Sequence, residues 1–284
     1  MTGSRSGLRS TSSRSGAPRA KKRFGQHFLS DANILRRIVD AAELEAADAV
    51  LEVGPGLGTL TDVLAERASR VVAVEVDHDL VARLRERFAA TSRVAIIDGD
   101  VLASTPGELL RAGGAAAPYV VVANLPYNVA APVLRQFLEG DVRPRRLVVM
   151  VQLEVAEAIV ARPGGMSLMS VATQVYGDTS MVMKVAPGSF SPPPNVQSAV
   201  VRIDVLPTPR VDVPLDAFFR VVRAGFGNPR KQLRNSLSFG LQVKQTVVDE
   251  VMERADIDVT LRPQMLSIDD WASITRAWTA RPQP

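Results

Sequence analysis

Short apolar, β-branched runs that alternate with helix-like segments constrain the fold of this 284-residue chain more than any other feature. Each run has the length and composition of a strand buried on both faces, and such strands occur in parallel sheets covered by helices. The sequence therefore predicts an α/β fold around a mostly parallel sheet. Ligands of such sheets bind at the carboxyl ends of the strands, so the residues after each run are candidates for a site. The relevant runs are residues 49–53, 70–75, 94–97 and 119–123.

The turns after the first three runs carry residues suited to a nucleoside. The first run leads into a turn with Gly54 and Gly56, where the backbone can turn tightly and approach a ligand. Its G-x-G-x-G spacing differs from the G-x-G-x-x-G of dinucleotide sites. Glu75 ends the second run and can accept both hydroxyls of a ribose. Asp100 follows the third run and can accept a hydrogen bond from an adenine amine, while Val101 can pack on the ring. Each acid alone is typical of a solvated loop, but the features in register indicate a nucleoside site.

The fourth run ends at the sequence Asn124-Leu125-Pro126-Tyr127. Two oxygens here can accept hydrogen bonds from the two N–H groups of an exocyclic amine. One is the side-chain oxygen of Asn124. The other is the carbonyl of Leu125, a residue that Pro126 restricts to an extended conformation. Tyr127 can lie flat against the same base. The alternative is an ordinary turn, since Asn and Pro are common turn residues and Tyr can simply pack.

Composition excludes several other classes of site. There is no cysteine, so disulfides, thiolate nucleophiles and cysteine-ligated metals are absent. His27 and His78 are the only histidines and lie far apart in sequence, which disfavours a histidine metal centre or a histidine-based triad. We therefore predict no metal site. No apolar run approaches the length of a membrane span.

The chain is predicted to have a tail and two domains. Residues 1–20 are rich in Ser, Gly and Arg and are expected to be disordered. This tail fits a basic arm that holds RNA, a transit peptide or a solvated segment without a specific role. A secretory signal is disfavoured because the tail has no apolar core segment. Residues 21–206 hold the predicted strands. Prolines near residue 207 mark the start of a helical domain over residues 207–284.

Basic residues are concentrated in two regions of the chain. The net charge is +4, yet residues 1–23 carry seven basic side chains and no acid, so the remainder is slightly acidic at −3. Between Asp216 and Asp249 there is no acid, and Arg and Lys are interleaved with Phe. Charge runs are usually solvated faces, but an acid-free span in an acidic body indicates a phosphate-binding surface. A stiff proline loop, residues 191–194, follows Phe190, which is either a hairpin residue or a second aromatic wall for a base.

These motifs together resemble the ribosomal RNA adenine dimethyltransferase family of the KsgA type, over nearly the whole chain after the tail. The resemblance implies a Rossmann-like class I methyltransferase fold with a seven-stranded mostly parallel sheet and a small helical C-terminal domain that binds RNA. It also implies S-adenosylmethionine as the cofactor. The segments that carry the resemblance are residues 24–29, 52–58, 74–77, 99–100, 124–128, 190–202 and 230–237.

The resemblance and the motifs assign expected roles to individual residues. The catalytic residues are expected to be Asn124, Leu125, Pro126 and Tyr127. The cofactor-binding residues are expected to be His27, Leu29, Gly54, Gly56, Glu75, Val76, Asp100, Val101 and Asn124. The residues that contact the substrate RNA are expected to be Phe190, Arg223, Arg230, Lys231 and Arg234.

Two positions depart from the family pattern. His27 stands where the family usually has Asn, so its imidazole either replaces the hydrogen bond of an amide or only its shape. Asn228-Pro229 stands where polar or basic residues are more usual, which weakens the inferred RNA contact there.

The resemblance implies transfer of two methyl groups to each of two adjacent adenines near the 3′ end of small-subunit (16S) ribosomal RNA. The expected protein is a cytoplasmic monomer that acts on an immature small ribosomal subunit, away from membranes. Three alternatives remain. One is an Erm-type methyltransferase of large-subunit RNA, although Tyr127 and the proline loop favour the KsgA type. Another is a nucleic-acid-binding factor with this fold and no required catalysis. The third, a nicotinamide-dependent oxidoreductase, is disfavoured by the glycine spacing.

Overall fold

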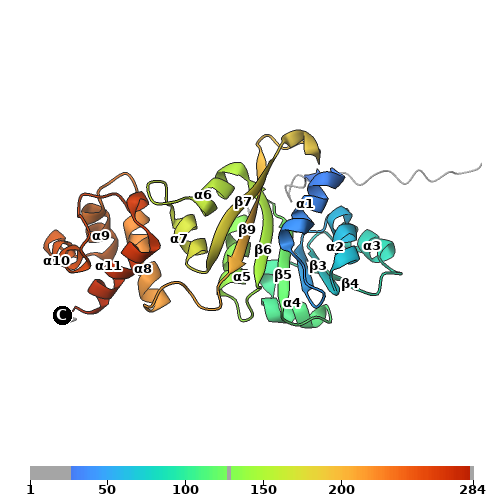
Figure 1. The fold of residues 1–284 in the computed structure, drawn as a ribbon, viewed down its shortest axis with the longest axis horizontal. Coiled ribbons are helices and arrows are strands. Elements are labelled where there is room, and N and C mark those ends of the chain that lie inside the picture. The colour runs from blue at the N-terminus through green and yellow to red at the C-terminus, as the bar shows by residue number, and fades with distance from the viewer. Residues whose placement is uncertain (1–26, 127–128, 282–284) are drawn as a thin grey trace, which may run out of the picture.

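In the computed structural model, which describes residues 27–126 and 129–281, the four predicted apolar runs form adjacent strands of a seven-stranded sheet. Its strands are β2 (Ala49–Val53), β3 (Arg70–Glu75), β4 (Val94–Asp98), β5 (Tyr119–Asn124), β6 (Arg146–Gln152), β7 (Gly177–Val185) and β9 (Ser198–Val205). The spatial order is β4-β3-β2-β5-β6-β9-β7 (Figure 1). Neighbours from β4 to β6 pair in parallel, and β9 is antiparallel to both β6 and β7. The predicted α/β fold with a mostly parallel sheet is confirmed.

The helices that cover the sheet lie between residues 32 and 174. They are α1 (Ala32–Ala42), α2 (Thr59–Arg67), α3 (His78–Arg87), α4 (Pro106–Ala112), α5 (Ala130–Glu139), α6 (Leu153–Val160) and α7 (Leu168–Gln174). Asp31 caps α1 by accepting from the backbone N–H of Asn33 at 2.9 Å.

Alternate residues of the central strands face two separate cores. In β2, Leu51 and Val53 pack with residues of α4 to α7 on one face of the sheet. Val50, which precedes them, packs with residues of α1 and α2 on the other face. This alternation is the ordinary consequence of the strand pleat. It means that the even-numbered residues of β2, including Glu52, point to the side that carries α2.

Two elements were not fully predicted. The sequence predicts a strand only from Met181, but β7 begins four residues earlier, at Gly177. Gly177 and Thr179 are buried, alternate with exposed neighbours and pair with β9. The composition of these residues is typical of a turn. They form a strand because they pair with β9, and not because of their own β-propensity. Helix α7 was missed as well, and it begins at a capping box formed by Ser167 and Ser170.

The C-terminal segment is helical and occupies one end of the long axis of the molecule, with β3 and β4 toward the other (Figure 1). Its helices are α8 (Leu215–Phe226), α9 (Leu233–Leu241), α10 (Gln245–Ala255) and α11 (Ile268–Thr279). Close packing here requires a small residue at Gly225, because a Cβ there would lie 2.3 Å from the Trp271 ring. Among the residues with described positions, no helix is long and apolar enough to cross a bilayer.

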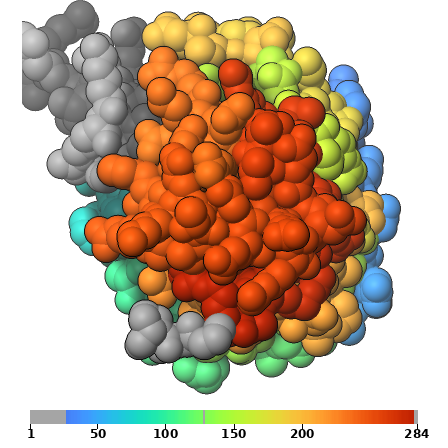
Figure 2. All heavy atoms as spheres, turned by 90° about the vertical axis from the view of Figure 1, so that its left-hand side faces the viewer, coloured from blue at the N-terminus to red at the C-terminus, as the bar shows by residue number. Residues whose placement is uncertain are grey.

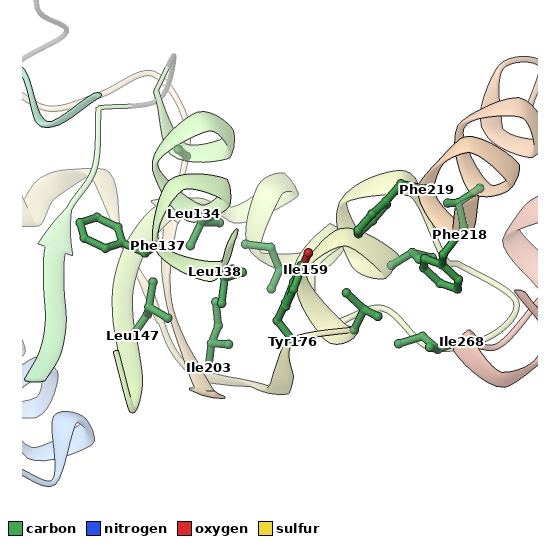
Figure 3. Packing of buried hydrophobic residues seen from close by; sticks show 14 of the residues in the cluster. Leu134, Phe137, Leu138, Leu147, Ile159, Tyr176, Ile203, Phe218, Phe219 and Ile268 are labelled. Carbon is green, nitrogen blue, oxygen red and sulfur yellow. The ribbon is translucent and has the colours of Figure 1, made fainter. Parts of the chain in front are cut away.

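A continuous apolar core joins the C-terminal helices to the sheet (Figure 3). Tyr176, just before β7, stacks on Phe219 of α8 with ring centroids 6.3 Å apart, and Phe218 meets Phe219 edge to face at 5.4 Å. The boundary at residues 206–207 stays a prediction. It falls between the end of β9 and the start of α8, but apolar packing crosses it.

Candidate functional site

A cavity of about 190 Å³ lies at the carboxyl ends of β2, β3 and β5. It is bounded by the turns that follow these strands and by a segment just before α1. The predicted residues that line it are His27, Leu29, Gly54, Gly56, Glu75, Val76, Asp100, Val101, Asn124, Leu125, Pro126 and Phe190. The structure therefore brings together the residues that the sequence nominates from separate turns. Tyr127 lies outside the described residues.

The glycine turn and Glu75 form one hydrogen-bonded unit. Gly54 and Gly56 have φ angles of 68° and 59°, in the left-handed region that favours glycine. The N–H of Gly56 donates to Glu75 Oε2 at 3.1 Å, and the N–H of Asp77 donates to Oε1 at 3.0 Å. The carboxylate at the end of β3 is thus fixed against the turn after β2. Burial raises the pKa of Glu75, and the backbone N–H groups of Asp77 and Gly56 oppose that rise.

The turn after β4 offers an acid between apolar side chains. Asp100 is exposed, and its Oδ1 accepts from the N–H of Leu102 at 2.9 Å. Val76 and Leu102 line the cavity and are 44% and 39% exposed, whereas Val101 is buried. A polar acceptor flanked by apolar walls suits a planar heterocycle with an exocyclic amine. Leu102 was not predicted from the sequence.

Asn124, the last residue of β5, is held by a backbone carbonyl from the other side of the cavity. Its Nδ2 donates to the carbonyl of His27 at 3.2 Å. A carbonyl can only accept, so this contact fixes which end of the amide is the nitrogen. The oxygen Oδ1 is then the end available to accept from a ligand. The next residue, Leu125, is anchored by its own N–H, which donates to the Met150 carbonyl of β6 at 3.0 Å.

Residues before α1 and after β7 close the cavity through a two-stranded pairing. Strand β1 (Phe28–Leu29) pairs antiparallel with β8 (Phe190–Ser191). Thr59 at the start of α2 adds a hydrogen bond from its Oγ1 to the Leu29 carbonyl at 3.1 Å. The Phe190 ring is only 5% exposed and packs in the α1 core, so little of its face is available to a base. Its predicted stacking role remains a prediction.

Glu52 is a residue of the cavity that the sequence reasoning missed. It sits near the end of β2, is 1% exposed and lines the cavity. Its Oε2 accepts from Thr61 Oγ1 of α2 at 2.7 Å, while Oε1 has no hydrogen-bond partner among the described residues. Burial raises the pKa of Glu52 to about 8, and the nearby Glu75 charge adds to the rise. A glutamate inside an otherwise apolar buried run was the available signal.

The predicted RNA-contacting residues outside the cavity lie in the C-terminal helices and the turn between α8 and α9. Arg230 and Lys231 are exposed, as is Arg223, whose guanidinium is 6.0 Å from the centroid of the Phe219 ring. Arg234 differs because it forms a bidentate ion pair with Asp249 of α10, with Nε–Oδ1 at 2.6 Å and Nη2–Oδ2 at 2.5 Å. The segment between Asp216 and Asp249 contains no acid, but the fold places Asp249 itself against Arg234.

Within residues 27–126 and 129–281, no group of three or more His, Asp or Glu side chains has a geometry that could hold a metal ion. The donors at the cavity are instead single carboxylates, an amide and backbone groups. That donor set suits hydrogen bonding to an organic ligand.

Solved structures with this fold define its class. A 23S rRNA methyltransferase, ErmE, superposes with a TM-score of 0.71 at 25% identity, covering 88% of this chain and 98% of that one. A dimethyladenosine transferase from Plasmodium falciparum superposes with a TM-score of 0.72 at 22% identity, covering 87% and 96%. The fold is that of the Rossmann-like rRNA methyltransferases.

Sequence comparison is more specific. The family model for ribosomal RNA adenine dimethylase matches residues 17–278. A ribosomal RNA small subunit methyltransferase A from Dehalococcoides mccartyi is 43% identical over 265 residues, which cover 93% of this chain and 90% of that protein. One from Geobacter sulfurreducens is 42% identical, covering 92% and 96%. The chain belongs to the ribosomal RNA adenine dimethylase family.

The buried carboxyl of Glu52 predicts an unusual pH dependence of stability. Its pKa in the folded state, about 8, lies above the ordinary value of 4.5, so between these values only the folded state holds the proton. The free energy of unfolding should therefore fall as pH rises through this window, by about 1.4 kcal/mol per pH unit from this group. The raised pKa of Glu75 acts in the same direction.

Urea unfolding of wild type and Glu52→Gln between pH 5 and 8 measures this contribution. The amide keeps an acceptor for Thr61 but cannot ionise, so the variant should gain stability relative to wild type as pH rises. The same pH dependence in both proteins would contradict an ionisable buried Glu52.

Proposed function

We propose that this protein transfers methyl groups from S-adenosylmethionine to the N6 amines of two adjacent adenines near the 3′ end of small-subunit ribosomal RNA, giving N6-dimethyladenosine. The observation that carries the proposal is the Asn124 amide beside the cavity, with its nitrogen committed to the His27 carbonyl. An amide oriented in this way presents an acceptor to an amine.

The polar groups at the cavity suit those of S-adenosylmethionine. The turn after β2 favours glycine at position 56, because its φ is positive and a Cβ there would lie 3.1 Å from the Phe28 ring. Glu75 would hold the ribose hydroxyls, and Asp100 the adenine amine between Val76, Val101 and Leu102. The Oε1 atom of Glu52, which has no hydrogen-bond partner within the described chain, would accept from the cofactor's ammonium group.

The bound cofactor would supply an electrophilic methyl group, and the protein would position the nucleophile. An adenine amine is a poor nucleophile because its lone pair is delocalised into the ring. Asn124 Oδ1 and the Leu125 carbonyl would accept hydrogen bonds from the two N–H groups of this amine. These hydrogen bonds would favour a more pyramidal nitrogen. Catalysis would then rest on positioning and electrostatics rather than on a strong base. Tyr127 would stack on the target base, which must be unstacked from its neighbours.

The C-terminal helices would contact RNA away from the target adenines. Figure 2 looks onto the end of the molecule that these helices form, which Figure 1 places far from β3 and β4. Arg223, Arg230 and Lys231 are exposed on this part of the chain and would bind phosphates. Arg234 would contribute less, since Asp249 already neutralises its charge.

The relatives favour small-subunit RNA as the substrate over large-subunit RNA. Those named small subunit methyltransferase A are 40–43% identical to this chain, whereas the large-subunit enzyme ErmE is 25% identical. Asn124, Leu125 and Pro126 all line the cavity, which supports catalysis over binding alone. We place the reaction in the cytoplasm, on an immature small subunit, with the protein acting as a monomer.

Mass analysis of RNA tests the proposed activity directly. Incubation of the protein and S-adenosylmethionine with unmodified small-subunit particles should yield N6-dimethyladenosine at two adjacent positions near the 3′ end. Glu75→Ala should give much less product at limiting cofactor. Product in large-subunit RNA would instead support the Erm alternative, and binding to RNA without any methylated adenine would support the binding-only alternative.

Salt dependence tests the proposed RNA surface. Replacing Arg230 and Lys231 together by Gln should weaken RNA binding and flatten the log–log salt slope by about 0.7–0.9 for each phosphate that the variant no longer neutralises. Cofactor affinity should not change. The matched control is Arg234→Gln, whose ion pair with Asp249 predicts a smaller change in slope. An unchanged slope in the double variant would make this surface a solvated face.

A further inference from the structure

The orientation of the Asn124 amide depends on a residue nearly a hundred positions away in the chain. The Nδ2 of Asn124 donates to the main-chain carbonyl of His27, a separation of 97 residues. A flipped amide would turn its N–H2 group toward the cavity and its oxygen toward another oxygen. The flipped form cannot accept from an amine, so whatever holds the His27 carbonyl in place also sets the chemistry of Asn124.

The His27 carbonyl is held by contacts to the proline loop. The His27 ring nitrogen Nδ1 lies 2.8 Å from the Pro192 carbonyl. Because that carbonyl only accepts, Nδ1 must carry the hydrogen, in either the neutral or the protonated ring. Strand β1 also pairs with β8, and the N–H of Ser30 donates to the Ser189 carbonyl at 3.3 Å. The β1 strand is only two residues long, so each of these contacts bears strongly on where its backbone lies.

We propose that His27 is a positioning residue, whose ring binds Pro192 and thereby keeps its own carbonyl on the Asn124 amide. The imidazole would act on methyl transfer through Asn124. This inference rests on the proposed methyltransferase function. It differs from a cofactor contact by the His27 ring, because removal of the ring should slow the transfer step while leaving cofactor affinity unchanged.

Side-chain geometry supplies a matched pair of variants. In Asn, as in His, the donor nitrogen is bonded to the atom that follows Cβ, so an Asn at position 27 can donate to the Pro192 carbonyl from nearly the same place. Leu has a similar size but no donor. His27→Asn should therefore keep the function of the ring, and His27→Leu should lose it.

A readout that needs neither RNA nor cofactor comes first. Side-chain amide NMR of Asn124 in the free protein should show a protected N–H2 group in wild type and in His27→Asn. In His27→Leu the same group should exchange faster with solvent and shift in frequency. Equal exchange in all three proteins would overturn the inference.

Single-turnover methyl transfer at saturating cofactor and RNA gives the second readout. His27→Leu should be about 3- to 10-fold slower than wild type, as for the loss of one ordinary hydrogen bond, and His27→Asn should be close to wild type. Cofactor affinity from calorimetry should agree within error in all three. The control is Val196→Ala, an exposed position two residues after the proline loop, which should leave the rate unchanged.

A double-mutant cycle separates action through Asn124 from an independent effect. In an Asn124→Ala background, His27→Leu should cause no further slowing, because no amide remains to be positioned. If the rate effects of His27→Leu and Asn124→Ala multiply, or if His27→Leu weakens cofactor binding, the inference is overturned while the proposed function stands. A wild-type protein that transfers no methyl group would instead contradict the proposed function itself, and the NMR comparison would still decide the role of His27.

Discussion

The parallel register of β3, β2 and β5 is the constraint on which the site depends. Val53 is opposite Val74 on one side and Ala123 on the other, so the three strands end at the same edge of the sheet. The residues that follow them therefore meet although they are distant in sequence. The hydrogen bond from Gly56 to Glu75 and the one from Asn124 to His27 then tie the converging turns together. Without this alignment, neither the acids nor the amide would face a common cavity.

Burial gives the cavity an electrostatic preference. Glu52 and Glu75 are both nearly inaccessible, and burial raises the pKa of each because a carboxylate loses hydration there. A positively charged ligand would recover part of that loss by pairing with the ionised forms. Buried carboxyls of this kind cost stability when no cation pairs with them, and residues with shifted pKa values are common at functional sites.

Sequence patterns predicted those parts of the fold and site that follow from local order along the chain. Apolar runs predicted the strands of the sheet. The position just after a strand is a local feature of the sequence, so the residues that line the cavity could be predicted in the same way. Glu52, the β1–β8 pairing and the Arg234–Asp249 ion pair were not predicted. The pairing and the ion pair depend on which distant segment packs opposite, which neither periodicity nor motif spacing reveals. Glu52 was overlooked although it stands as a charged residue inside an apolar run. The first half of β7 was missed for the same reason, since its pairing with β9 overrides a turn-like composition.

In the proposed reaction, the two ends of the Asn124 amide have different roles: the nitrogen faces His27, and the oxygen faces the substrate amine. The most direct measurement is the single-turnover rate of Asn124→Asp at saturating S-adenosylmethionine and RNA. A carboxylate keeps the acceptor but cannot donate to the His27 carbonyl, and two facing oxygens repel. Methyl transfer should therefore slow sharply although the side chain has nearly the same shape. A wild-type rate in this variant would contradict the claim that the hydrogen bond to His27 orients the catalytic acceptor.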